Sequence, residues 1–188
     1  MTWRGFILGF IIGLITVPVV AFLYFQFGLA PVATASSPIP LEKFLAQTAL
    51  HAAIGRSAPK DSPVPATEPN VMAGAKIYRE NCAVCHGLPG VERTAIARGE
   101  YPKPPQLLQG HGVTDDPAGE TFWKTKNGIR LTGMPGFDGA LTDEQIWQVS
   151  QMLATADKLP ASVQQELRRP DTVIQAVAPA PTSSSGQR

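Results

Sequence analysis

Cysteine is scarce in this chain of 188 residues, in which Cys82 and Cys85 are the only two. A structural zinc site normally takes four ligands, often as two Cys or Cys/His pairs, and no second pair of this kind is present. The chain also has almost no net charge, because it contains 16 Lys and Arg and 15 Asp and Glu. The composition therefore indicates neither a nucleic-acid partner nor a strongly acidic one, and we expect no nucleic acid to bind.

Formal charge is absent from one long stretch, residues 5–27. As a helix rising about 1.5 Å per residue, this run would extend roughly 34 Å, and a hydrocarbon core is about 30 Å thick. The run is longer than the apolar region of a cleaved signal peptide, which is about 7 to 15 residues. We therefore predict a retained transmembrane anchor; the alternative is cleavage near the small residues Ala33-Thr34-Ala35.

Positive charges flank this run on one side only. Arg4 and the amino terminus precede it, and the next cation along the chain is Lys43. Because cytoplasmic flanks carry the excess of Lys and Arg, residues 1–4 are predicted to be cytoplasmic. The rest of the chain would then lie on the periplasmic side of the inner membrane, behind a single span.

Prolines and glycines, 18 and 17 in number, divide the remaining chain into three parts. Residues 28–69 are rich in proline and predict an extended connector, interrupted by a short amphipathic helix at 41–54. Residues 70–157 carry the patterns of a folded domain. Residues 158–188 predict a short helix at 161–168 and otherwise a largely disordered tail.

The helix at 41–54 has three possible locations. Pro40 suits its first turn, and Gly55 is expected to end it. The helix can rest on the folded domain, lie on the membrane surface or pack against a partner subunit. His51, which belongs to this helix, is predicted to be a surface residue and not a ligand.

The two cysteines belong to the motif Cys82-Ala83-Val84-Cys85-His86. Two cysteines three apart with a histidine directly after the second form the attachment pattern of c-type haem, in which the imidazole ligates iron. On a helical turn, residues i, i+3 and i+4 share one face, so both thiols and the imidazole can point at one flat macrocycle. A thioredoxin-like dithiol is the alternative, but it would stand beside a βαβ pattern, which the flanking sequence lacks.

Three helices are predicted in the folded domain, at 71–83, 118–126 and 143–155. The last one begins with a capping box formed by Thr142 and Gln145. These patterns predict an all-α fold. A domain of fewer than about 90 residues has little material for a core, so the haem itself is expected to supply much of the apolar contact.

The first of these helices carries a notch at Gly74 beside Tyr78, one turn further on. We predict that the helix at 143–155 packs into this notch, because a glycine lets two helices cross closely. In the middle helix, Phe122 and Trp123 are expected to point inward.

A haem iron held by His86 needs a second axial ligand, and four side chains are candidates for this role. Met134 lies in a stretch too rich in glycine and proline for a helix or strand. A methionine in a surface loop would expose apolar area to water, so its side chain is expected to contact a buried partner. His111, also in a glycine-flanked loop, is the rival ligand. Met152 is better explained by helix packing, and Met72 is too close to the cysteines in sequence. We favour Met134.

Several features follow one another along residues 70–157 in a characteristic order and spacing. They are the Gly74 and Tyr78 helix, the Cys82-Ala83-Val84-Cys85-His86-Gly87 motif, the Gly133-Met134-Pro135 loop and the helix that follows Leu141-Thr142. Together they resemble a class I monohaem cytochrome c, in particular the membrane-anchored bacterial type and the haem c domains of cbb3-type oxidases. The anchor, the connector and the tail lie outside the resemblance.

The resemblance implies one covalent haem c on Cys82 and Cys85, with His86 and Met134 as the axial ligands of the iron. It also implies electron transfer rather than catalysis as the activity. Redox partners of the expected kind are an oxidase, a dehydrogenase or a quinol-oxidising complex. In bacteria, covalent haem attachment takes place outside the cytoplasm, which agrees with the orientation predicted from charge.

Two further functions stay open at this stage. The chain can be a permanent haem c subunit of an oxidase or dehydrogenase complex, with the helix at 41–54 as its interface. It can also be a haem sensor in which the Met134 bond is labile and the iron binds a small molecule. The sequence offers no acid–base pair near the iron beyond His111 to support the sensor.

The resemblance also suggests residues around the haem. His86 would donate its free ring N–H to a backbone carbonyl near Pro104, which fixes the ring. Trp123, Tyr101 and Arg98 are candidates to reach the haem propionates, with ordinary packing or solvation as the alternative.

A cluster of cations, Lys124, Lys126 and Arg130, precedes the Met134 loop. Such a cluster at a haem edge can attract an acidic partner. The alternative is a solvated face neutralised by neighbouring acids such as Asp116.

Overall fold

The computed structural model describes residues 3–109 and 116–170, and these residues contain helices and no β-strand. The chain divides into two compact units, Met1–Lys43 and Phe44–Arg188. The predicted all-α fold is confirmed.

The first unit contains helix α1, which runs Trp3–Gln26. It is long and apolar enough to cross a membrane, and none of its residues is buried by the protein. A signal sequence near an N-terminus has the same length and composition. The helix thus lies within one or two residues of the predicted run, and retention of the anchor stays a prediction.

Helix α2 runs Glu42–Ser57 and ends later than expected. Gly55 does not terminate it, because the helical backbone continues through this residue. Near its C-terminal end Ile54 is buried, whereas His51 is exposed as predicted.

The proline-rich segment after α2 packs on the folded domain. Val64 packs against a cluster of Phe122, Ile146 and Trp147, and its carbonyl accepts a 2.9 Å hydrogen bond from Gln151 Nε2. This part of the connector is therefore extended but fixed in place, which its composition alone did not indicate.

Helices α3, Glu68–Asn81, and α4, Ala83–His86, replace the single helix predicted at 71–83. Pro69 occupies the first turn of α3, where a missing N–H costs nothing. Cys82 separates the two helices with φ −114° and ψ −34°, while its N–H still donates to Tyr78 O at 2.8 Å. The haem motif thus continues the helix as one offset turn.

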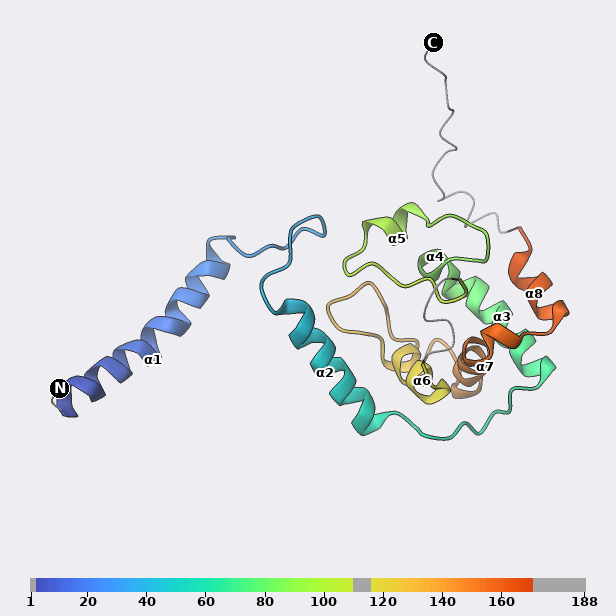
Figure 1. Ribbon diagram of the computed structural model, residues 1–188, viewed down its shortest axis with the longest axis horizontal. Coiled ribbons are helices and arrows are strands. Elements are labelled where there is room, and N and C mark those ends of the chain that lie inside the picture. The colour runs from blue at the N-terminus through green and yellow to red at the C-terminus, as the bar shows by residue number, and fades with distance from the viewer. Residues whose placement is uncertain (1–2, 110–115, 171–188) are drawn as a thin grey trace, which may run out of the picture. The chain divides into compact units, whose positions relative to one another are not determined.

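Helix α7, Asp143–Ala154, crosses α3 at the predicted notch (Figure 1). A Cβ on Gly74 would collide with the backbone carbonyl of Gln148 on α7. Tyr78, one turn further along α3, is completely buried. The predicted capping box is present, with Thr142 and Gln145 each bonded to the other's backbone N–H.

We expect Gly74→Val to lower the free energy of unfolding of the haem-loaded protein by about 1–3 kcal/mol, the usual cost of overpacking. The new side chain meets backbone atoms of α7, which cannot rotate away. Guanidinium denaturation checks this. Gly55→Ala is the control, because a Cβ there meets nothing within 4 Å, and it should stabilise α2 by about 0.5–1 kcal/mol. Equal stability of Gly74→Val and the parent would contradict the close crossing.

Helix α6 runs Ala118–Asn127 and packs against α7. The Phe122 ring stacks on Trp147 with centroids 4.2 Å apart and planes 19° apart. Of the two aromatic residues expected to point inward, Phe122 is buried and Trp123 is half-buried. The short helices α5, Ala95–Gly99, and η1, Ala156–Lys158, were not predicted.

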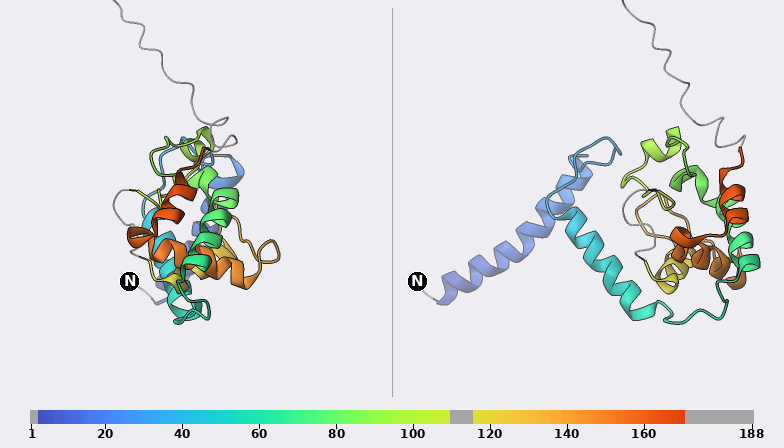
Figure 2. Two further views of the ribbon diagram at one scale, coloured as in Figure 1. Left: turned by 90° about the vertical axis from the view of Figure 1, so that its right-hand side faces the viewer. Right: turned by 45° about the vertical axis from the view of Figure 1, so that its right-hand side comes forward.

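Helix α8 occupies the predicted range, Ala161–Arg168, and lies alongside α3 in both views of Figure 2. Its Val163 and Leu167 are buried in the same core as Tyr78 and Met152. The core therefore extends beyond residue 157, the predicted end of the folded domain. The tail predicted after residue 170 lies outside the described residues.

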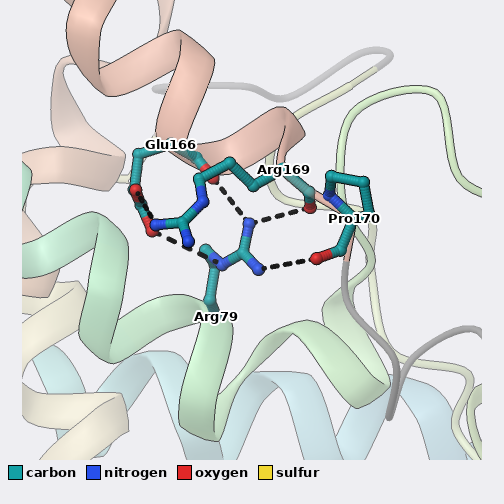
Figure 3. Close-up of polar contacts among 4 residues, drawn as sticks. All are labelled: Arg79, Glu166, Arg169 and Pro170. Atoms are coloured by element: carbon teal, nitrogen blue, oxygen red, sulfur yellow. Dashed lines mark hydrogen bonds and ion pairs between the residues drawn. The ribbon is translucent and has the colours of Figure 1, made fainter.

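Arg79 ties the end of α3 to the end of α8 (Figure 3). Its Nη1 donates to the carbonyls of Glu166 at 2.6 Å and Arg169 at 2.9 Å, and its Nη2 donates to Pro170 O at 3.4 Å. Its Nε lies 3.7 Å from the Glu166 carboxylate. The guanidinium thus caps the Glu166 carbonyl in the last turn of α8, where carbonyls lack intrahelical partners, and also holds the carbonyls of the two residues that follow the helix.

Arg79→Met is expected to destabilise the haem-loaded protein by about 1–3 kcal/mol, because the carbonyls at the end of α8 lose a charged donor. Lys76→Met is the matched control: Lys76 is an exposed residue of the same helix, and its loss should change stability by less than about 0.5 kcal/mol. Thermal unfolding of both variants measures the difference. Equal melting temperatures would show that Arg79 does not hold α8.

Candidate haem centre

One cleft in the second unit gathers most of the residues that the sequence singled out. Its lining combines the end of α3, the α4 turn, the segment that follows α5, α6 and the loop after it, one residue of α2 and two residues of α7. The lining includes Leu50, Cys82, Cys85, His86, Glu100, Lys103, Pro105, Lys124, Gly133, Met134 and Pro135. Carbon atoms dominate the lining, as a flat apolar macrocycle requires.

The α4 turn directs three residues of the motif to this cleft. The N–H groups of Cys85 and His86 both donate to Cys82 O, at 3.1 and 2.9 Å. This closes a helical turn, so that Cys82, Cys85 and His86 line the cleft together. Ala83 is instead buried in the core, as expected for an intervening residue.

Both thiols are held in their protonated form. Burial, together with the neighbouring Cys85, raises the pKa of the Cys82 thiol to about 12. Burial and the Glu100 carboxylate raise the pKa of the Cys85 thiol to about 11. At neutral pH both groups are therefore thiols, and each would supply the sulfur and hydrogen of a thioether bond to a haem vinyl group.

His86 is oriented by a backbone carbonyl, as predicted, although the acceptor is one residue further along. His86 Nδ1 lies 2.8 Å from Pro105 O, and the Pro104 carbonyl instead accepts a 2.7 Å bond from Arg93 Nη1. Burial lowers the pKa of His86, which favours the neutral ring that a metal ligand needs. With Nδ1–H donated to Pro105, Nε2 is the nitrogen left to ligate.

Gly87 closes the turn behind His86. Its φ of +77° belongs to the region that favours glycine, and a Cβ there would collide with the Gln106 side chain. Its carbonyl accepts a 2.8 Å hydrogen bond from the buried Tyr78 hydroxyl. Tyr78 therefore links the α3 and α7 crossing to the haem motif.

Met134 stands at the end of a tight loop. The N–H of Met134 donates to Thr132 Oγ1 at 3.1 Å, and its carbonyl accepts from Ile129 N at 3.2 Å. Gly128 and Gly136 pass so closely that a Cβ on Gly128 would lie 2.5 Å from Gly136 N. The glycines around the loop thus allow its backbone segments to pass close to each other. Met134 lines the cleft and is half-buried.

The other candidate ligands lie elsewhere. Of the methionines within residues 3–109 and 116–170, Met134 is the one that lines the cleft. Met152 is fully buried in the core, and Met72 packs against that core. His111, the rival to Met134, lies outside the described residues.

The residues proposed for the haem propionates are placed differently from expectation. Trp123, Tyr101 and Arg98 do not line the cleft, and Arg98 donates to Arg93 O at 2.7 Å. Lys103 and Lys124 do line it. These lysines are the cations of the described chain best placed to face carboxylates within the cleft.

Two members of the predicted cationic cluster are paired with neighbouring acids. Lys124 Nζ lies 2.5 Å from Asp116 Oδ2, and Lys126 Nζ lies 2.6 Å from Asp143 Oδ1. Arg130, the third member of the cluster, forms no ion pair among the described residues. The interpretation as a solvated, neutralised face therefore fits these lysines better than an attractive patch for an acidic partner.

Sequence reasoning missed three residues of this region. Leu50 of α2 and Glu100 after α5 line the cleft, and Arg93 holds the carbonyl beside the His86 acceptor. No local pattern marks them, because each reaches the site through the path of the chain and not through its neighbours in sequence.

The residues present fit a covalently attached haem. Two thiols and an imidazole line an apolar cleft, and a thioether side chain from a separate loop lines the same cleft. Within the described part of the chain, no group of three or more His, Cys, Asp or Glu side chains is arranged so that it could hold a metal ion.

Comparison with known proteins identifies relatives of the domain that contains this cleft. Residues 69–151 match the family described as cytochrome C oxidase, cbb3-type, subunit III. The chain is 32% identical over 81 residues to cytochrome c6 of Limnospira maxima, an alignment that covers 43% of this chain and 86% of that protein.

Two larger proteins also match. A thiosulfate dehydrogenase of Allochromatium vinosum is 35% identical over 89 residues, which is 47% of this chain and 32% of that protein. A 1-butanol dehydrogenase (cytochrome c) of Thauera butanivorans is 33% identical over 89 residues, which is 47% of this chain and 12% of that protein. The chain thus spans about a third of the first dehydrogenase and about an eighth of the second. Because the match to cytochrome c6 covers most of that protein, the chain belongs to the class I monohaem cytochromes c, a family of electron-transfer proteins.

Proposed function

We propose that this cytochrome c holds one covalent haem c on the periplasmic side of the inner membrane, where α1 anchors it, and carries single electrons between respiratory partners. In this proposal Cys82 and Cys85 attach the haem, and His86 and Met134 ligate its iron. When bound, the haem supplies a one-electron Fe(II)/Fe(III) couple.

The observation that carries the proposal is the shared cleft. Met134 lies far from Cys82, Cys85 and His86 in sequence, yet all four line one cavity. A thioether sulfur opposite an imidazole raises the potential of a haem. Two axial ligands also leave the iron without an open position for a substrate, which suits a carrier better than a catalyst.

The surrounding residues support this role by holding the site rigid. Pro105 O fixes the His86 ring, and Tyr78 fixes the turn that bears it. A site held in this way would need little rearrangement when a bound iron gains or loses an electron. An anchor would further keep the haem near partners in the same membrane, which raises their effective concentration.

Fractionation of cells tests the anchor and the location together. We expect full-length protein with covalent haem in washed membranes, and an intact N-terminus by mass spectrometry. Residues 28–188 behind a cleavable signal peptide are the control, expected to give a soluble periplasmic haem protein. A soluble product of the full-length chain that begins near Ser36 would contradict the anchor and leave the haem site unaffected.

A permanent subunit of a dehydrogenase or oxidase complex is the second candidate. The observation in its favour is that this domain recurs in two proteins named as dehydrogenases, of which it forms the smaller part. Mild detergent extraction and gel filtration separate the two candidates. A haem peak at the size of the detergent-bound monomer supports the free carrier, and a stoichiometric partner in the peak supports the subunit.

A further inference from the structure

Glu100 places a carboxylate inside the cleft. It follows α5 directly and is the residue at which that helix ends. Its Oε1 accepts a hydrogen bond from the Cys85 thiol at 3.2 Å. The carboxylate therefore lies beside the sulfur that the haem would use for attachment.

The same carboxylate contacts the loop that bears Met134. A Cβ on Gly133 would lie 2.6 Å from the Glu100 Cδ and within 2.9 Å of both carboxylate oxygens. Glu100 thus packs directly on the α-carbon of the residue that precedes Met134. Its position is fixed by contacts from both the attachment turn and the ligand loop.

Among residues 3–109 and 116–170 Glu100 forms no ion pair, although Lys103 and Lys124 line the same cleft. The neighbouring arginines are directed elsewhere, since Arg93 donates to Pro104 O and Arg98 donates to Arg93 O. The Cys85 thiol is its hydrogen-bond donor. Thioether formation at Cys85 would replace that S–H by an S–C bond, so the carboxylate would lose this hydrogen-bond donor.

We propose that Glu100 tunes the haem, lowering its reduction potential by stabilising Fe(III) over Fe(II). Reduction removes one positive charge from the iron, and a nearby carboxylate in a cleft of low dielectric disfavours that change. This role rests on the covalent haem of the proposed function. It opposes the effect of the Met134 sulfur, so the potential would be set by a balance between the two side chains.

Spectroelectrochemical titration of three variants tests the role. Glu100→Gln removes the charge and keeps the shape, and Glu100→Ala removes both. Glu92→Gln is the matched control, because it removes the same charge from an exposed residue outside the cleft. Each variant is first stained for covalent haem and checked for an unchanged c-type spectrum.

At an ambient potential equal to the midpoint of the parent, both Glu100 variants should show an Fe(II)/Fe(III) ratio about three- to tenfold higher, tenfold corresponding to about 59 mV for one electron. Glu92→Gln should change the ratio less than about 1.5-fold. Equal ratios for Glu100→Gln, Glu100→Ala and Glu92→Gln would overturn the tuning role while leaving the haem site intact. A parent protein without covalent haem would overturn the proposed function and this role with it.

Discussion

Replacing both Cys82 and Cys85 by Ala will leave the chain without covalently attached haem. Each sulfur supplies one thioether bond, and Cys82 and Cys85 are the only cysteines of the sequence. Haem staining of a denaturing gel should fall from full intensity to background. Because the cleft is lined mainly by carbon and the haem would fill it, the unattached chain should also lose helicity by circular dichroism.

The single variants are the controls for this result. Cys82→Ala and Cys85→Ala each keep one thioether position, so each should retain stainable haem with a shifted pyridine haemochrome band. Covalent haem in the double variant would contradict the attachment site. Loss of haem in a Ser150→Ala control, whose residue is not part of the cleft lining, would instead indicate a general folding defect.

Met134→Ala should retain the covalent haem and lower its reduction potential by on the order of 0.1–0.2 V, a fraction of the range over which axial ligands set haem potentials. The thioether sulfur favours Fe(II), and its removal leaves a position at which water or carbon monoxide binds. Redox titration and a reduced spectrum with carbon monoxide measure both effects.

Two control variants separate Met134 from its rivals. Met152→Leu changes a methionine that is fully buried in the core, and it should leave the potential unchanged. His111→Ala tests the competing ligand in the same way. A potential that falls in His111→Ala and not in Met134→Ala would move the sixth ligand to His111.

Local signals in the sequence predicted the parts of this fold that depend on neighbouring residues. The haem motif, the capping box at Thr142 and the boundaries of α8 each follow from a few consecutive residues. The notch at Gly74 was also predictable, because a glycine one turn before a buried Tyr78 marks a close helix crossing.

Other features depend on the path of the chain between distant residues. The hydrogen-bond acceptor of His86 is the Pro105 carbonyl and not the Pro104 carbonyl, because the latter accepts a hydrogen bond from Arg93. No sequence pattern near either proline reveals that contact. Glu100 reaches the cleft for the same kind of reason, through α5, a helix too short to be predicted from its five residues.

Composition was misleading after residue 157. The proline- and serine-rich end of the chain suggested that little of it was ordered, but Val163 and Leu167 are spaced one turn apart and both are buried against α3. Arg79 supplies the partner that holds this helix, and a cation on another helix leaves no trace in the local sequence.

An optical spectrum of the purified protein, oxidised and reduced, with and without carbon monoxide, tests the central claim most directly. The account predicts a low-spin c-type spectrum with the weak near-infrared band of a sulfur–iron bond, unchanged by carbon monoxide. That result would establish axial ligation by His86 and a methionine, and Met134→Ala would identify the methionine. A reduced spectrum that shifts with carbon monoxide would contradict the six-coordinate carrier and favour a haem that binds small molecules.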